Sequence, residues 1–278
     1  MLHNLSFAYR APRFLIRKLH EWRNTRLWLE GGDNRFSRSR ERLLLLKNKH
    51  AGKPCVLIGG GPSINKMDLG KLKDTVTICC NGFHLKIPEI GFSPTYYTVE
   101  DPLPARDNAE QILNNESIKI VPLDLMHIFK NYDDSEVIYT NLRRSKTTYL
   151  SSQFPLFSAN FADESYWGGT VIYYNIQLAH YLGCNPIYLI GVDLSYVIPD
   201  EIKRRGAVLQ SVGDDPNHFD PRYFGEGKKW HLPETERMQL SFSKALASLD
   251  EQGVRLINLG VDSKLQDVPK GNFDEIFV

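Results

Sequence analysis

The chain of 278 residues lacks the features of several protein classes. Its four cysteines form no CxxC pair, and none of its apolar runs reaches the roughly 18–20 residues of a membrane-spanning helix. The N-terminus also has no apolar core of the roughly 7–15 residues that a signal peptide contains. The sequence therefore predicts reduced, buried thiols in a cytoplasmic protein that neither crosses a membrane nor carries an export signal.

The short motifs of several common enzyme classes are missing as well. There is no GxGxxG, no GxxxxGK[ST], no GxSxG and no HExxH. These absences argue against an ordinary nicotinamide enzyme, a P-loop NTPase, a serine hydrolase and a zinc peptidase. No metal site is predicted from His or Cys clusters.

Charge is distributed unevenly along the chain. Residues 1–50 hold twelve Lys/Arg and four Asp/Glu, which leaves 22 and 29 of the totals of 34 and 33 for residues 51–278. An acidic body disfavours nucleic acid as a partner. Apolar residues of the basic N-terminal segment recur at helical spacing. Pro12 suits a first turn, and Leu15, Leu19, Trp22 and Leu29 form an apolar stripe. Residues 10–49 therefore suit either a helix on an anionic bilayer surface or an arm packed on the body or on a second subunit.

From residue 55 onward, short β-rich runs alternate with helical stretches. The runs are continuous and apolar, which is typical of a mostly parallel sheet covered by helices. We expect one α/β domain at 51–278, Rossmann-like with helices on both faces, preceded by the basic arm at 1–50. Strands are expected at 55–59, 75–80, 95–99, 117–122, 136–140, 186–192 and 254–259, and helices near 64–72, 105–115, 170–182 and 235–252.

Residues 194–234 interrupt this rhythm, with no helix or strand expected beyond a single turn. A connection of about forty residues is far longer than usual and is normally either functional or disordered. This one is rich in Tyr, His, Asp and Arg, so we favour a lid over the site.

Glycine-rich turns mark two candidate ligand positions. The first strand runs into Gly59, Gly60, Gly61, Pro62 and Ser63, where free N–H groups at a helix start could hold a phosphate. A tight structural turn is the alternative. Asn81 follows the second strand, and Gly168, Gly169 and Thr170 precede the 170–182 helix at the same predicted crevice.

Polar residues follow other strands. Glu100 and Asp101 could hold Mg²⁺ or an acceptor, or form a turn before Pro102. Asp193 ends a strand and is followed by Tyr196. His218 lies in the long loop, where a histidine could act as a general base.

The order of these motifs resembles two related bacterial groups. VLIGGGPSI, ICCNGF, GGTVIYYNIQLAHYLGCNPIYLIGVDLSY and DDPNHF are similar to the sialyltransferases of glycosyltransferase family 42. They are equally similar to the proteins that share a domain with 6-hydroxymethylpterin diphosphokinase and the flagellin-modifying motility accessory factors. The resemblance spans roughly residues 55–262 and implies a GT-A-like variant of the Rossmann-like fold.

The sialyltransferase resemblance implies roles for particular residues. Gly59 to Ser63, Asn81, Gly168 to Thr170 and Asp193 would bind the nucleotide of a CMP-activated acidic sugar such as sialic acid. Tyr196 would contact the leaving phosphate, and His218 would be the general base of an inverting single displacement onto a hydroxyl. The acceptor would be a surface glycan, as in lipopolysaccharide synthesis, with a lipid-linked glycan among the alternatives, and no cofactor would be required.

The sequence also departs from the sialyltransferase pattern. Gly60 stands where the family usually has Asn, and Glu100-Asp101-Pro102 replaces an Asn-Pro-Ser type segment. These departures leave two other functions open. One is an ATP- and Mg²⁺-dependent diphosphokinase of the 6-hydroxymethylpterin type, and the other is a non-catalytic nucleotide-binding module. Oligomeric state stays open, with a homo-oligomer among the alternatives.

Overall fold

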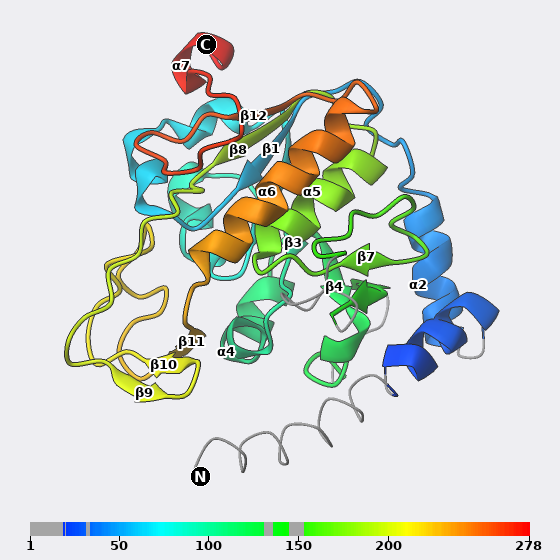
Figure 1. The fold of residues 1–278 in the computed structure, drawn as a ribbon, viewed down its shortest axis with the longest axis horizontal. Helices are drawn as coiled ribbons and strands as arrows, with labels where there is room; N and C mark the ends of the chain where they lie inside the picture. Colours follow the sequence, from blue (N-terminus) through cyan, green and yellow to red (C-terminus); the bar gives the residue numbers. More distant parts are fainter. Residues whose placement is uncertain (1–18, 20, 32–33, 131–135, 145–152) are drawn as a thin grey trace.

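A computed structural model of the protein describes residues 19, 21–31, 34–130, 136–144 and 153–278. At its centre is a seven-stranded sheet in the order β12-β8-β1-β2-β3-β4-β5, in which every neighbouring pair is parallel (Figure 1). The strands are β1 (Cys55–Ile58), β2 (Val76–Cys80), β3 (Tyr96–Thr98), β4 (Ile118–Pro122), β5 (Val137–Thr140), β8 (Ile187–Ile190) and β12 (Leu256–Asn258). All seven lie within the predicted runs, and the α/β, Rossmann-like class is confirmed.

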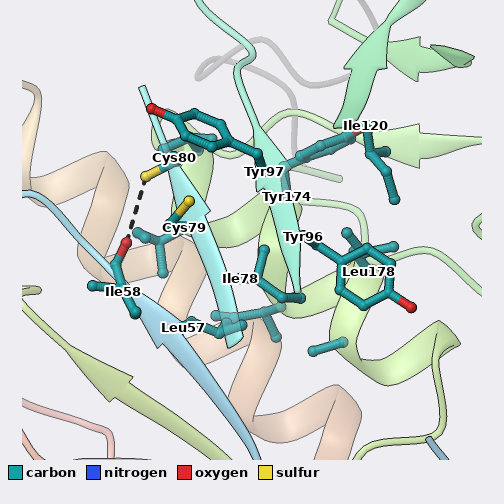
Figure 2. Packing of buried hydrophobic residues seen from close by; sticks show 14 of the residues in the cluster. Leu57, Ile58, Ile78, Cys79, Cys80, Tyr96, Tyr97, Ile120, Tyr174 and Leu178 are labelled. Carbon is teal, nitrogen blue, oxygen red and sulfur yellow. Dashed lines mark hydrogen bonds between the residues drawn. The ribbon is translucent and has the colours of Figure 1, made fainter. Parts of the chain in front are cut away.

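Helices surround this sheet. They are α2 (Asn34–Leu44), α3 (Ile87–Ile90), α4 (Pro102–Leu113), α5 (Val171–Tyr181), α6 (Thr235–Asp250) and α7 (Phe273–Ile276). Figure 1 shows α5 and α6 side by side across the sheet. In Figure 2, Tyr174 and Leu178 of α5 gather with Ile78, Tyr96 and Ile120 of three neighbouring strands, and all five belong to the buried core. Burial of these apolar side chains is the main stabilisation of the sheet.

The order of the strands fixes where a ligand can bind. From β1 the chain continues to β2 on one side, whereas β8 lies on the other side of β1. In open α/β sheets, ligands bind outside the carboxyl ends of the strands where the order reverses. The loops after β1 and β8 therefore face one crevice.

The helix expected at 64–72 is wrong. The chain instead forms two short 3₁₀ helices, η1 (Pro62–Lys66) and η2 (Leu69–Leu72), and two more at η3 (Phe83–Leu85) and η4 (Leu123–Leu125). Asp68 separates the first two, because its extended backbone breaks the helix and its carboxylate accepts a hydrogen bond from the Gly70 N–H at 3.0 Å. No α-helix therefore follows the first glycine loop.

Residues 194–234, where no helix or strand beyond a single turn was expected, contain three short strands. The segment forms an antiparallel sheet of β9 (Lys203–Arg205), β10 (Val208–Gln210) and β11 (Lys229–His231). These strands are three residues long and every residue of β9 is exposed, so they lack the apolar pattern that reveals a buried strand. A two-stranded parallel sheet of β6 (Leu142–Arg143) and β7 (Ser165–Tyr166) lies outside the central one.

Part of the basic arm packs on the body. Residues 21–30 are helical, and Trp28 is fully buried, with its Nε1–H donating to the carbonyl of Ala162 at 2.8 Å. Helix α2 follows and runs along β5, where Arg42 donates to the Val137 carbonyl at 3.1 Å. Pro12 of the predicted first turn and Leu15 of the predicted apolar stripe lie outside the described residues.

The cysteine prediction is confirmed, because all four thiols are free and buried. Burial raises the pKa of Cys80 to about 12, so this thiol stays protonated near neutral pH. Within the described part of the chain, no helix is long and apolar enough to cross a membrane.

Candidate active site

A small cavity of about 100 Å³ lies where the loops after β1, β2 and β8 meet the start of α5 and the long loop. Its lining includes eight of the predicted site residues: Gly59, Gly60, Gly61, Asn81, Thr170, Asp193, Tyr196 and His218. Six others do not line it: Pro62, Ser63, Glu100, Asp101, Gly168 and Gly169. The fold thus joins residues that are up to 159 positions apart in the sequence.

His218 is held by a carboxylate that the sequence analysis did not single out. Its Nδ1 lies 2.7 Å from Oδ2 of Asp215, which also accepts from the Phe224 N–H at 2.9 Å. Burial alone would raise the pKa of Asp215, but the hydrogen bonds from His218 and from the Asn217 and Phe224 N–H groups outweigh it and lower that pKa. Asp215 is therefore a carboxylate that accepts the Nδ1 proton, and the basic nitrogen of a neutral His218 is Nε2.

The imidazole is also positioned by packing. It stacks on the ring of Tyr223 with centroids 4.0 Å apart and planes 8° from parallel. The imidazole also lies against Gly60, since a Cβ added to this glycine would be 2.7 Å from Cδ2 of His218. The loop and the glycine turn are joined further by the Phe219 N–H, which donates to the Gly60 carbonyl at 3.0 Å. His218 is therefore fixed against the first glycine turn.

The first glycine turn is hydrogen-bonded to the loop after β8. The N–H groups of Gly59 and Gly61 donate to Ile190 and Gly191 carbonyls at 2.8 and 2.9 Å. Asp193 accepts from the N–H and the hydroxyl of Ser63, at 3.0 and 2.5 Å. Asp193 and Ser63 thus hold two loops together, and the nucleotide contact that the resemblance implies for them stays a prediction.

Asn81 is the residue of this crevice with an unsatisfied polar atom. Its backbone has a positive φ of 53°, a conformation that non-glycine residues seldom adopt. Its Oδ1 is buried and has no hydrogen-bond partner among the described residues. A buried acceptor without a partner costs about 1–3 kcal/mol, so it favours a ligand that donates a hydrogen bond there.

The second glycine turn presents a helix start to the cavity. Thr170 caps α5 by accepting from the Ile172 N–H at 3.3 Å, and Thr170, Val171 and Ile172 all line the cavity. Gly169 has a φ of 84°, which turns the chain into the helix. The N-terminus of an 11-residue helix carries a partial positive charge, which favours an anionic group in this part of the cavity.

Tyr196 lies at the side of the same cavity, with its hydroxyl 4.0 Å from Sδ of Met238. Burial, and then the nearby charge of Asp193, raises the pKa of Tyr196 to about 12. The phenol therefore stays protonated near neutral pH and can donate a hydrogen bond to an anionic ligand.

Glu100 and Asp101 are engaged elsewhere. Glu100 is buried and pairs with Arg144 at 3.0 Å, yet burial still raises the pKa of Glu100 to about 7. Asp101 caps α4 through the Leu103 N–H at 2.8 Å and pairs with His231 of β11 at 2.6 Å. Both carboxylates thus have protein partners, and the described residues hold no group of three or more His, Cys, Asp or Glu that could bind an ion. The assignment of this pair to Mg²⁺ or an acceptor stays a prediction.

Two site residues were missed in the sequence. Asp215 stands three positions before His218 in DDPNHF, and this spacing was the available signal. The ring of Tyr223 stacks on His218 and also lies against Gly82. A Cβ added to Gly82 would be 2.8 Å from this ring. Nothing in the local sequence distinguishes this tyrosine from the twelve others.

Comparison with known proteins gives two findings. No curated protein matches the chain. Among solved structures, the chain is similar to the MAf glycosyltransferase from Magnetospirillum magneticum AMB-1, with 16% identity and a TM-score of 0.48 over 81% of this chain and 34% of that one. The chain thus spans about a third of that protein's length, and likeness at this level carries no functional conclusion.

A family profile is more informative. The profile described as 6-hydroxymethylpterin diphosphokinase MptE-like matches residues 35–199, which is more than half of the 278 residues. The match includes β1 to β8 with Asn81, Asp193 and Tyr196, and it ends before His218. It confirms the resemblance to the domain that the pterin diphosphokinases share with the motility accessory factors. The chain belongs to the 6-hydroxymethylpterin diphosphokinase MptE-like family.

Proposed function

We propose that this protein is a transferase that moves an acidic sugar, sialic acid or a related nonulosonic acid, from a CMP-activated donor to a hydroxyl of a surface-glycan acceptor. The observation that carries the proposal is the Asp215–His218 pair, 2.7 Å apart, on a cavity that also contains the start of α5. A base and an anion-binding helix start in one cavity suit the attack of an alcohol on a carbon that bears a phosphate leaving group.

The reaction proceeds as a single inverting displacement. His218 Nε2 takes the proton of the acceptor hydroxyl, and the oxygen of that hydroxyl forms a bond to the anomeric carbon of the donor sugar. The bond from that carbon to the phosphate oxygen breaks, and CMP leaves with the electron pair. The N-terminus of α5 and the Tyr196 hydroxyl stabilise the charge on the departing phosphate. Asp215 keeps the imidazole oriented and stabilises its protonated form.

The long loop closes this cavity. At about 100 Å³ the space is smaller than the roughly 300–1,000 Å³ of sites that enclose a drug-sized ligand. The Phe219 carbonyl accepts from Asn65 Nδ2 at 2.8 Å, which adds to the contact between Phe219 and Gly60. Donor binding therefore requires the loop to move outward, and its return would exclude water from the activated sugar.

Asp215→Asn is expected to lower kcat for CMP release from CMP-N-acetylneuraminic acid by about 10²-fold near neutral pH, with a small change in KM. The amide can donate to Nδ1 and so favours the tautomer in which Nε2 is protonated and cannot accept a proton. The residue acts through His218, so the pH profile of kcat is the second readout, and its acidic limb, where protonation inactivates a general base, should shift. Asp214→Asn is the matched control, because Asp214 is the neighbouring acid and is exposed. Equal kcat and pH profiles for both variants would contradict a positioning role.

The family match favours a second candidate function. The matching profile is named for a diphosphokinase, and such an enzyme would transfer a diphosphate from ATP to a pterin-like alcohol with Mg²⁺. Under this candidate Glu100→Gln or Asp101→Asn abolishes activity, whereas His218 substitutions have little effect. The third alternative, a module without activity that keeps the nucleotide crevice as a scaffold, predicts that no nucleotide shifts the melting temperature.

Thermal unfolding with CMP, CDP, UDP, GDP and ATP, each with and without Mg²⁺, separates these functions. We expect CMP alone to raise the melting temperature, since a ligand at a hundred times its Kd adds about 2.7 kcal/mol to the free energy of unfolding. Stabilisation by ATP only in the presence of Mg²⁺ would replace the sugar-transferase proposal with the diphosphokinase. No shift with any nucleotide would contradict both.

A further inference from the structure

The first described helix of the arm has one side fixed and one side exposed. Trp28 is fully buried and hydrogen-bonded to Ala162, so it anchors residues 21–30 to the body. Figure 1 shows this helix in dark blue at the periphery of the molecule, beside α2. Its orientation is therefore set by the fold and does not depend on a partner.

The exposed side carries large apolar residues. Leu19, Trp22 and Leu29 are 68%, 59% and 52% exposed. At 3.6 residues per turn these three lie within about 80° of one another, and each lies at least about 100° from Trp28. Burying one such side chain is worth about 1.5–3 kcal/mol, so three on one exposed side favour contact with an apolar phase.

Arginines accompany this apolar stripe. Arg26 lies between its members, with the guanidinium 5.7 Å from the centre of the Trp22 ring and 2.9 Å from Glu30, and Arg23 is exposed one position after Trp22. The surrounding segment 1–50 has twelve basic and four acidic residues, in contrast to the acidic remainder. Apolar side chains with flanking arginines on one side of a surface helix are typical of binding at an anionic lipid interface.

We propose that this Trp22 face, made of Leu19, Trp22, Arg23, Arg26 and Leu29, binds the surface of an anionic lipid bilayer. The apolar members enter the boundary between headgroups and acyl chains, and the arginines contact the phosphates. Trp28 keeps the helix attached to the catalytic body, so the whole enzyme is held at the membrane. This inference is independent of the reaction that the cavity performs.

Sedimentation of the full-length protein with vesicles tests the proposal. We expect binding to vesicles of phosphatidylcholine with phosphatidylglycerol, weak binding to phosphatidylcholine alone, and a decrease on raising the salt concentration. Leu29→Glu should weaken binding by at least about tenfold. Leu240→Glu is the matched control, because Leu240 is a leucine on helix α6 with 49% exposure, and it should bind like the wild type.

The charge contribution is tested separately with Arg23→Glu, which should weaken binding to the anionic vesicles by about tenfold and leave the melting temperature unchanged. Two results would overturn the proposal. One is equal vesicle binding by Leu29→Glu, Leu240→Glu and the wild type. The other is no vesicle binding by the wild type together with a dimer in light scattering that Leu29→Glu dissociates, which would assign the face to a second copy of the chain.

Discussion

His218→Ala is expected to lower the rate of CMP release from CMP-N-acetylneuraminic acid by about 10²–10⁴-fold, the range for loss of a general base. The proton of the attacking hydroxyl then loses its acceptor, because Asp215 is not among the residues that line the cavity. KM for the donor should change little, since the leaving phosphate is assigned to the start of α5 and Tyr196. Initial rates over a series of donor concentrations measure both quantities.

Structural damage must be separated from the loss of the base. The imidazole packs on Tyr223, so His218→Gln, which retains most of the side-chain volume, is the second variant, and the melting temperature of each is recorded. His127→Ala is the control, because His127 is an exposed histidine that follows η4 and does not line the cavity. A fully active, folded His218→Gln enzyme would contradict the proposed base. A wild-type enzyme inactive on every CMP-linked acidic sugar would contradict the proposed reaction itself.

Gly59→Ala is expected to destabilise the protein by about 3 kcal/mol or more. The loops after β1 and β8 approach each other through their backbones, and the new Cβ would overlap the carbonyl oxygen of Gly191 and lie 2.8 Å from its carbon. Neither partner is a flexible side chain. Relief therefore requires the two central strands to separate, which would also weaken the hydrogen bond from the Gly59 N–H to Ile190.

Chemical denaturation measures this effect as a change in the free energy of unfolding, and a thermal scan should show a decrease of roughly 6–12 °C. Gly213→Ala is the control, because an added Cβ there meets nothing within 4 Å. That variant should stay within about 0.5 kcal/mol of the wild type. Similar stability of Gly59→Ala and Gly213→Ala would show that the loops can separate without cost.

The sequence by itself determined the central sheet and its family. Each of the seven strands is a short apolar run between polar segments, and a strand buried on both faces produces this signal regardless of its neighbours. Strand order then placed Gly60, Asn81 and Asp193 at one crevice, because the carboxyl ends of parallel strands share an edge. The sequence also predicted helices α5 and α6. Its motifs indicated the family whose profile matches residues 35–199.

Tertiary structure decided the partners of the site residues. Asp193 lines the cavity, and its carboxylate accepts from both donors of Ser63, which is 130 positions away. Glu100 looked like half of a metal site, yet the fold supplies Arg144 as its counter-ion. Strands β9 to β11 are each only three residues long, and Trp28 donates its Nε1–H to the carbonyl of Ala162, 134 positions away. Periodicity records which side chains are buried, whereas hydrogen bonds between distant segments depend on how the chain is brought together in space, and a local pattern does not encode them.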